Sequence, residues 1–439
     1  MAGETLRNRT LRTALADAEA RYTAANPESR RRHDAATVAM PGGNTRTVLF
    51  YAPFPLTVVR GEGAQLWDAD GHAYADFLGE YTAGLYGHSH PVIVAAVKRA
   101  LDDGIVLGGH NLYEAGLAAA LTERFPSLDL VRFCNSGTEA NLMAIATARA
   151  VTGRARILVF EGAYHGGVFS YAAGGSPLNA PYPTVIGRYN DPESAAAAIA
   201  DHAGDLACVV VEPMLGAGGC IPAEPEFLRA LREATAREGV VLIFDEVMTS
   251  RLAPGGLQAV SGVTPDLTTL GKYLGGGLSF GAFGGRADIM ARFDPRHPGA
   301  FPHAGTFNNN VLTMAAGLAG LSDVWTPDAC AALNRAGEGL RGRLAAAIAA
   351  RGLPLQVTGR GSMMTLHLHD RPLRAPSDAP PADARARALV HLELLARGHY
   401  TARRGMMILS LASTADDIDG LVAAFDEVLD EYGDLLSAA

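Results

Sequence analysis

The sequence is poor in lysine, and this scarcity limits where amine chemistry can take place. Lys and Arg together number 37, yet only two of them are lysines, Lys98 and Lys272. Lys98 lies in PVIVAAVKRALDDG, a helical pattern in which it is expected to face solvent. Lys272 lies among glycines and apolar residues in TTLGKYLGGGLSFGAFGG. A reaction that needs a buried side-chain amine therefore has one candidate.

Other features that are missing exclude whole classes of protein. The four cysteines are scattered and form no C-x-x-C pair, so neither a disulfide framework nor a metal site is expected, and a reducing cytoplasm fits. No apolar run is long enough to span a membrane, and the N-terminal helical pattern lacks the apolar region of a secretory signal. The net charge is −9 and no basic stripe is present, so nucleic acid is not an expected partner.

The order of patterns along the 439 residues predicts two domains. Residues 6–40 predict a helix that ends at the MPGG turn, and residues 56–78 predict a small β-meander. From about residue 90 to 330, helical patterns alternate with apolar runs such as RILVFEG, LACVVVEP and VVLIFDEV. Such runs are typical of parallel strands that are covered by helices on both faces. Beyond residue 330, a long helix, the strands SMMTLHLH and GMMILSL around a surface loop at 371–386, and a last helix are expected.

The predicted fold class is therefore α/β, with a mostly parallel central sheet between helix layers. We expect a large domain at residues 76–330. The segments 1–75 (helix and meander) and 331–439 (α+β) are expected to form a smaller domain.

Polar residues that directly follow apolar strands are the candidates for a site, because open α/β sheets bind ligands at the carboxyl ends of strands. Ser136, Gly137 and Thr138 join a strand to a helix, where free backbone N–H groups suit a phosphate group. Plain helix capping is the alternative. Tyr164 and His165 follow the next strand between glycines and could cover a planar ligand; the alternative is a buried tyrosine in a flexible loop.

Two carboxylates and the second lysine extend this set. Asp245 follows five apolar residues, where a buried carboxylate is costly unless it meets a cation or several hydrogen-bond donors. The pyridinium nitrogen of pyridoxal 5′-phosphate would be such a cation; a structural ion pair or a helix cap is the alternative. Glu212 ends another strand and could position a cofactor or a loop. An apolar setting favours the neutral, nucleophilic amine of Lys272. One sheet thus carries groups that could bind a phosphate, stack on a ring, pair with a pyridinium nitrogen and react as an amine. Together they indicate pyridoxal phosphate.

At these residues the sequence resembles the class III aminotransferases of fold type I. The motifs NSGTEAN, GAYHG, VVVEP, FDEVMTS, TLGKYLGGG and GTFNNN carry the resemblance over nearly the whole chain. The N-terminal MPGG is similar to that of glutamate-1-semialdehyde 2,1-aminomutases. The chain as a whole looks like the bacterial β-phenylalanine aminotransferases, which share the aminomutase scaffold.

This resemblance implies a fold-type I homodimer with active sites shared between the subunits. Lys272 would hold pyridoxal phosphate as a Schiff base and move the proton, and Asp245 would bind the pyridinium nitrogen. The resemblance assigns the other contacts as follows: Ser136, Gly137, Thr138 and the neighbouring subunit's Thr306 to the phosphate, Tyr164 and Val247 to the two ring faces, and Arg46 to the substrate carboxylate.

The chain departs from the aminomutases near its C-terminus, where those enzymes resemble one another in placing a glutamate before a strand. Here Arg403 and Arg404 stand instead, and Arg404 could pair with a carboxylate. A transaminase binds an amino acid and a 2-oxo acid in turn, so two arginines, Arg46 and Arg404, suit it; a solvated pair at 403–404 is the alternative.

The sequence therefore favours a ping-pong transaminase that acts on an aromatic β-amino acid and a 2-oxo acid such as 2-oxoglutarate. The apolar segment LFYAPFP could line the aryl pocket. The alternatives are an isomerase that acts on glutamate-1-semialdehyde and a cofactor-binding scaffold without turnover.

Overall fold

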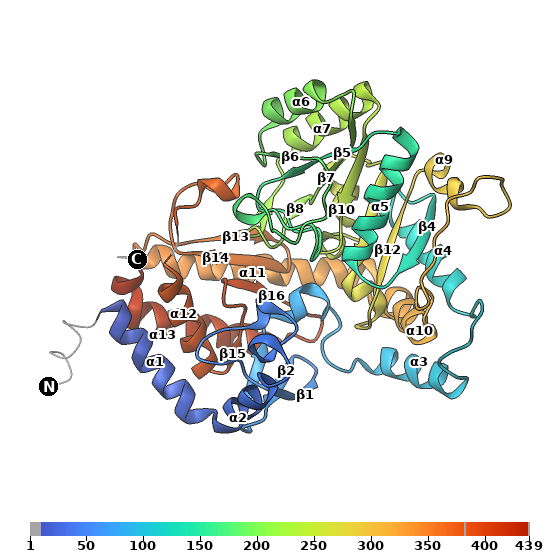
Figure 1. Ribbon diagram of the computed structural model, residues 1–439. Coiled ribbons are helices and arrows are strands. Elements are labelled where there is room, and N and C mark those ends of the chain that lie inside the picture. Colours follow the sequence, from blue (N-terminus) through green and yellow to red (C-terminus); the bar gives the residue numbers. More distant parts are fainter. Residues whose placement is uncertain (1–9, 382, 438–439) are drawn as a thin grey trace, which may run out of the picture.

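A seven-stranded sheet forms the centre of the larger part of the molecule in this computed structural model, which describes residues 10–381 and 383–437 (Figure 1). Strand β12 runs antiparallel to both of its neighbours, and the other adjacent pairs are parallel. In spatial order the strands are β4 (Leu130–Cys134), β12 (Gly281–Gly285), β11 (Leu267–Gly271), β10 (Val241–Asp245), β7 (Leu206–Val211), β5 (Arg156–Phe160) and β6 (Thr184–Gly187).

The central strands of this sheet are covered on both faces. Every residue of β7, β10, β11 and β12 is buried, and successive side chains of a strand point to opposite faces. Helix α5 (Gly137–Thr152) packs against these four strands, and α7 (Pro225–Glu238) packs against β7 and β10. The predicted α/β class with a mostly parallel sheet is confirmed.

Strand β12, with the sequence GAFGG, was not among the predicted strands. A Cβ atom on Gly281 would lie 2.1 Å from the carbonyl oxygen of Ser136, and one on Gly285 would lie 2.1 Å from that of Asp266. Glycine is therefore needed for the close approach of neighbouring backbone, although it has little tendency to form strands.

The two ends of the chain come together in the smaller part of the molecule, where the blue and red segments lie side by side in Figure 1. The predicted meander is confirmed as β1 (Val58–Glu62), β2 (Gln65–Asp68) and β3 (Ala73–Asp76). Strand β15 (His399–Tyr400) adds to β3 in parallel. The second small sheet consists of β13 (Gln356–Arg360), β14 (Met363–His367) and β16 (Met406–Ile408).

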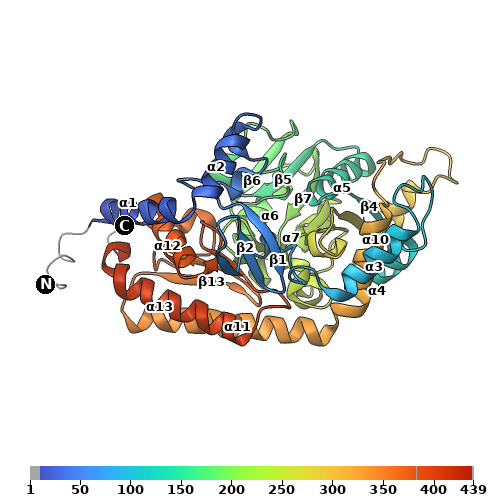
Figure 2. The ribbon, with the colours of Figure 1, turned by 90° about the horizontal axis from the view of Figure 1, so that it is seen from below.

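Long helices cover these two small sheets, and α11 and α13 run together along one edge of the molecule (Figure 2). Their bounds are Pro327–Ala350 for α11, Ala384–Ala396 for α12 and Ala415–Ser437 for α13. A shared apolar core joins α1, α11, α12 and α13 and also reaches Leu270 and Tyr273 of the large sheet region. The domain boundaries near residues 75 and 330 stay a prediction.

One local expectation was wrong, and a second holds except at its end. The helix expected at residues 6–40 is two helices, α1 (Leu11–Ala25) and α2 (Pro27–Ala36), and residues 6–9 lie outside the described range. The break falls at Asn26, because Pro27 supplies no backbone N–H and disfavours a helical residue before it. The surface loop expected at 371–386 already contains the start of α12, and its residues Leu373 and Pro376 line a cavity.

The remaining elements connect these parts: α3 (Pro91–Asp102), α4 (Glu114–Arg124), α6 (Pro192–Asp201), β8 (Met214–Leu215), β9 (Ile221–Pro222), α8 (Gly256–Ser261), α9 (Ala287–Met290) and α10 (Val311–Ala319). None of the helices within residues 10–381 and 383–437 combines the length and the apolar character that crossing a membrane requires. All four cysteines lie in the described part of the chain, where they are buried and unpaired.

Candidate active site

The structure brings five of the predicted segments together around one cavity of about 290 Å³ at the carboxyl ends of the parallel strands. The candidate residues that line it are Ser136, Gly137, Thr138, Tyr164, His165, Glu212, Asp245, Val247 and Lys272. Arg46, Thr306 and Arg404 do not line this cavity.

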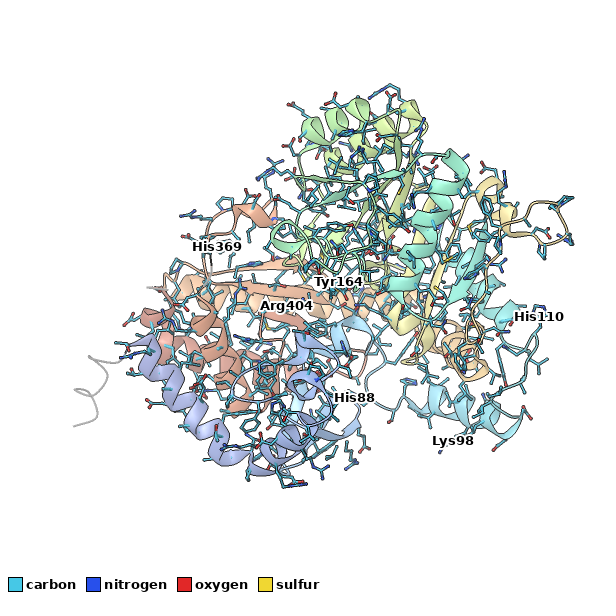
Figure 3. All side chains as sticks on the ribbon, in the orientation of Figure 1. His88, Lys98, His110, Tyr164, His369 and Arg404 are labelled. Atoms are coloured by element: carbon cyan, nitrogen blue, oxygen red, sulfur yellow. The ribbon has the colours of Figure 1, made fainter. Side chains whose placement is uncertain are left out.

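Lys272 directly follows β11 and lies partly buried in the wall of the cavity, with its backbone in the left-handed region at φ 56°. Its Nζ donates a hydrogen bond to the carbonyl oxygen of Tyr81 at 2.8 Å. Burial lowers the pKa of the Lys272 amine to about 8, although nearby Asp245 acts in the opposite direction. Lys98, in contrast, is exposed on α3, as predicted (Figure 3).

The carbonyl group that contacts Lys272 belongs to a strained turn. Glu80, Tyr81 and Thr82 are consecutive and have φ values of 47°, 50° and 81°. Left-handed backbone costs each such residue about 1 kcal/mol or more, and strain of this kind gathers at functional sites. This turn was not predicted to belong to the site, because the contact joins residues that are far apart in the chain.

Asp245 ends β10, and its neighbour strand β11 leads into Lys272, so both groups face the same cavity. The Oδ2 atom of Asp245 accepts a hydrogen bond from Asn141 Nδ2 at 2.8 Å and lies 2.8 Å from His165 Nδ1. Its Oδ1 atom accepts the backbone N–H of Val247 at 3.0 Å. These three contacts fix the orientation of a buried carboxylate. Asn141 was not predicted, although it lies within the NSGTEAN motif, one helical turn beyond Gly137.

The first turn of α5 forms another wall of the cavity. Ser136 caps the helix, since its Oγ accepts the backbone N–H of Glu139 at 3.1 Å. A Cβ atom on Gly137 would lie 2.8 Å from Cγ1 of Val247, so glycine keeps this backbone open to a ligand. The unpaired N–H groups of a helix start, together with the Thr138 hydroxyl, suit a phosphate group.

Glu212 holds the loop that carries Tyr164. Its Oε1 accepts the N–H of Tyr164 at 3.0 Å, and its Oε2 accepts the N–H of Gly216 at 2.9 Å. Burial raises the pKa of Glu212 to about 7. The Tyr164 side chain is 46% exposed and lies between the first cavity and a second one of about 580 Å³.

The two arginines expected to bind carboxylates lie around Tyr81. The guanidinium carbon of Arg404 is 4.8 Å from the centre of the Tyr81 ring, and Arg404 lines the second cavity together with Tyr164 (Figure 3). Arg46 forms an ion pair with Glu80, the residue before Tyr81. Thr306 is exposed on a loop of the same chain, outside both cavities.

These groups fit pyridoxal phosphate. A buried amine, a buried carboxylate and a helix N-terminus face one cavity, and they match the aldehyde, the pyridinium nitrogen and the phosphate of this cofactor in turn.

Comparisons with known proteins agree with this chemistry. The profile of the family "Aminotransferase class-III" matches residues 50–412. The chain belongs to the class-III aminotransferases. Pyridoxal phosphate is therefore the cofactor of this aminotransferase.

Individual relatives cover almost the whole aminotransferase. A β-phenylalanine transaminase from Variovorax paradoxus is 55% identical over 97% of this chain and 98% of its own length. The crystal structure of a β-phenylalanine aminotransferase from the same species superposes with a TM-score of 0.95, covering 97% of this chain and 99% of that one at 54% identity. A glutamate-1-semialdehyde 2,1-aminomutase from Sorangium cellulosum is 39% identical over 92% of this chain and 96% of its own length.

Proposed function

We propose that this aminotransferase moves an amino group from an aromatic β-amino acid, such as β-phenylalanine, to a 2-oxo acid such as 2-oxoglutarate. The observation that carries the proposal is Arg404, whose guanidinium stacks on Tyr81 and lines the cavity next to Tyr164. No carboxylate of the described residues pairs with it. The high identity to a β-phenylalanine transaminase supports the same substrate class.

Bound pyridoxal phosphate supplies an aldehyde carbon that accepts amino groups and a ring that withdraws electrons from that carbon. In our proposal Lys272 would hold the cofactor through its Nζ, and the same amine would move a proton to and from the substrate carbon that carries the amino group. Asp245 keeps a positive charge on the ring nitrogen. The start of α5 would hold the phosphate, and Tyr164 and Val247 would contact the two faces of the ring.

Assays with purified enzyme test the substrate class. We expect glutamate to form when either enantiomer of a 3-aryl-β-amino acid is mixed with 2-oxoglutarate, and we expect one enantiomer to react faster. If neither enantiomer of several such acids yields glutamate, the proposed substrate class is wrong.

The amino shift within glutamate-1-semialdehyde is the second candidate, because an aminomutase is 39% identical to this chain. That reaction needs no second acid, so it would produce 5-aminolevulinate in the absence of a 2-oxo acid. The arginine at position 404, where the aminomutases are expected to carry a glutamate, favours the transaminase.

We also propose a homodimer in which the partner subunit's Thr306 contributes to the phosphate site. The loops at 105–112 and 305–310 are tied together, since Asn111 Nδ2 donates to the carbonyl oxygen of Asn309 at 2.8 Å. They expose apolar side chains, with Val106 82%, Leu112 89% and Phe307 62% accessible. A second copy that covers these exposed apolar loops would remove this surface from water.

A further inference from the structure

The second cavity extends away from the cofactor site to another arginine, Arg387 of α12. Tyr164 and Arg404 form one part of its wall, and Arg387, Leu373 and Pro376 form another. Its volume of about 580 Å³ is roughly twice the 290 Å³ of the first cavity. The space beside the cofactor site therefore has two guanidinium groups in its wall.

Arg387 and Arg404 both lack a carboxylate partner within the described part of the chain. The Nε atom of each is buried and makes no hydrogen bond within the described part of the chain. Neither guanidinium forms an ion pair with a described carboxylate. Burial lowers the pKa of Arg387, with nearby Arg403 as the second cause. Both residues are partly buried, and a cation that is withdrawn from water without a carboxylate partner is costly. An anion that enters the cavity would relieve this cost.

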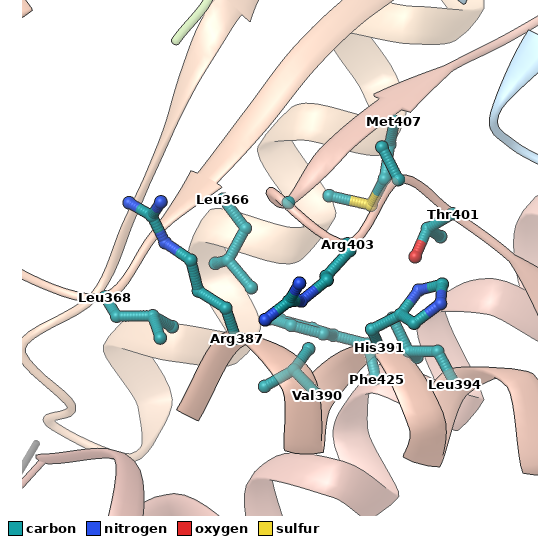
Figure 4. A pocket seen from close by; sticks show the side chains of 12 residues that line it. Leu366, Leu368, Arg387, Val390, His391, Leu394, Thr401, Arg403, Met407 and Phe425 are labelled. Atoms are coloured by element: carbon teal, nitrogen blue, oxygen red, sulfur yellow. The ribbon is translucent and has the colours of Figure 1, made fainter. Parts of the chain in front are cut away.

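The direction of the Arg387 side chain differs from that of Arg403. Both residues line a pocket of about 20 Å³ inside the smaller part of the molecule. Figure 4 shows the Arg403 guanidinium inside this pocket near Val390 and His391, while the Arg387 guanidinium points away from it. The aliphatic part of Arg387 lines the small pocket, so its guanidinium group can line the larger cavity.

Other charged or titratable groups in the wall of the larger cavity do not neutralise the two arginines. Glu161 is the one carboxylate among its described lining residues, and it accepts a hydrogen bond from Ser377 Oγ at 2.8 Å. Arg188 lies within electrostatic reach of Glu161. Burial lowers the pKa of His367 to about 4, so this ring is neutral at pH 7. The cavity therefore favours an anionic ligand.

We propose that Arg387 binds the distal carboxylate of a dicarboxylic amino acceptor while Arg404 binds the carboxylate next to the oxo group. This inference rests on the proposed transaminase function and names the acceptor class of the same site. An acid with a single carboxylate, such as pyruvate, needs only one of these arginines. An acid with a second carboxylate can use both arginines, and Arg387 thereby determines the preference between the two kinds of acid.

Binding of glutarate, an unreactive dicarboxylate, to the holoenzyme tests the proposal by calorimetry. We expect Arg387→Gln to weaken glutarate binding by about tenfold or more, the effect of losing one charge-assisted contact, and to leave propionate binding unchanged. Arg403→Gln is the matched control, because it removes an equal charge close by from a side chain outside the cavity; glutarate binding should stay within about twofold. Arg387→Lys, which keeps the charge but not the fork geometry, should give an intermediate value.

Kinetics give a second measurement. The KM for 2-oxoglutarate should rise in Arg387→Gln while the KM for pyruvate and the kcat with either acid change little. Unchanged glutarate affinity in Arg387→Gln, an equal loss in Arg403→Gln, or an equal loss for propionate would each overturn the role of Arg387. If glutarate binding responds as expected but no β-amino acid is turned over, the proposed donor fails and the acceptor site stands.

Discussion

At the scale of single residues, the two lysines differ in their surroundings. Lys272 is partly buried, donates a hydrogen bond to the Tyr81 carbonyl and lies within electrostatic reach of Asp245, whereas Lys98 faces solvent on α3. We expect Lys272→Ala to abolish the near-visible absorbance of the covalently held cofactor and to lower turnover by about three or more orders of magnitude. Borohydride reduction followed by peptide mass spectrometry should locate the cofactor on Lys272 in the wild type.

Lys98→Ala provides the matched control, since it removes the other lysine of the sequence. Its absorbance and turnover should equal those of the wild type. Cofactor attached to Lys98, or an unchanged spectrum in Lys272→Ala, would contradict the role given to Lys272.

The surroundings of Lys272 also predict a pH dependence. Burial lowers the pKa of its amine to about 8, and only the neutral amine attacks an aldehyde. In apoenzyme the rate of covalent cofactor attachment should therefore rise about tenfold per pH unit below pH 8 and level off above it. Absorbance-monitored mixing at several pH values measures this rate. A rate that still rises above pH 10, as for an exposed lysine, would exclude the depressed pKa.

The substitution Asp245→Asn tests the electrostatic interaction between Asp245 and Lys272 from the side of the carboxylate. The Asp245 carboxylate raises the pKa of Lys272, so its removal should shift the midpoint of attachment to lower pH. Turnover should fall by about three orders of magnitude, because an uncharged ring is a poorer electron acceptor. Near-normal turnover in a folded Asp245→Asn protein would mean that another group keeps the positive charge on the ring nitrogen.

At the scale of elements, the sequence predicted the apolar strands of the large sheet and missed the glycine-rich β12; the short strands β8, β9, β13 and β15 were not predicted either. Strands β5, β7 and β10 contain apolar runs of four or more residues, and polar residues at or after their ends do meet at one cavity. The sequence of β12 carries no such signal, because its glycines reflect contact with distant backbone. Proline correctly marked a turn at residue 41 but was overlooked at Pro27, where it ends α1.

The tight fit of β12 leads to a prediction for Gly281→Ala. The new methyl group would lie 2.1 Å from the Ser136 carbonyl oxygen, which belongs to rigid backbone at the start of α5. We expect the free energy of unfolding to fall by about 1–3 kcal/mol and cofactor affinity to fall with it, because Ser136 must move. Denaturant titration and cofactor titration measure the two effects.

Gly339→Ala on α11 is the control for this substitution. A Cβ atom there meets nothing within 4 Å, and the residue lies inside a helix. Stability should rise by about 0.4–1 kcal/mol with unchanged cofactor affinity. Equal effects of the two substitutions would show that the packing of β12 against Ser136 contributes neither to stability nor to cofactor affinity.

At the scale of the whole molecule, the exposed apolar loops predict a consequence of dimer formation. Val106→Glu places a charge in the surface that we expect a second copy to cover. Sedimentation should give twice the mass of the chain for the wild type and a mixture with single chains for the variant. Cofactor retention should fall in parallel if the partner's Thr306 helps to hold the phosphate. A wild type that sediments as a single chain would remove the dimer from the proposal.

The contacts that could not be predicted from the sequence are those between distant segments. The bond between Lys272 and Tyr81, the stacking of Arg404 on Tyr81 and the ion pair of Arg46 with Glu80 all depend on how the smaller part meets the large sheet. Local patterns determine secondary structure but contain no information on such pairings. The motif residues around Asp245 could be predicted because they end strands of the same sheet.

The parallel pairing of β15 with β3 has a consequence for the order of events during protein synthesis. His399 lies opposite Ala75 in this pair, and the turn that carries Arg404 follows directly. A ribosome must therefore release the C-terminal segment before the N-terminal meander gains its fourth strand. Until then the meander has an open edge that other nascent chains can pair with, and Arg404, which we propose to bind the acid, is the last of the candidate site residues to be made.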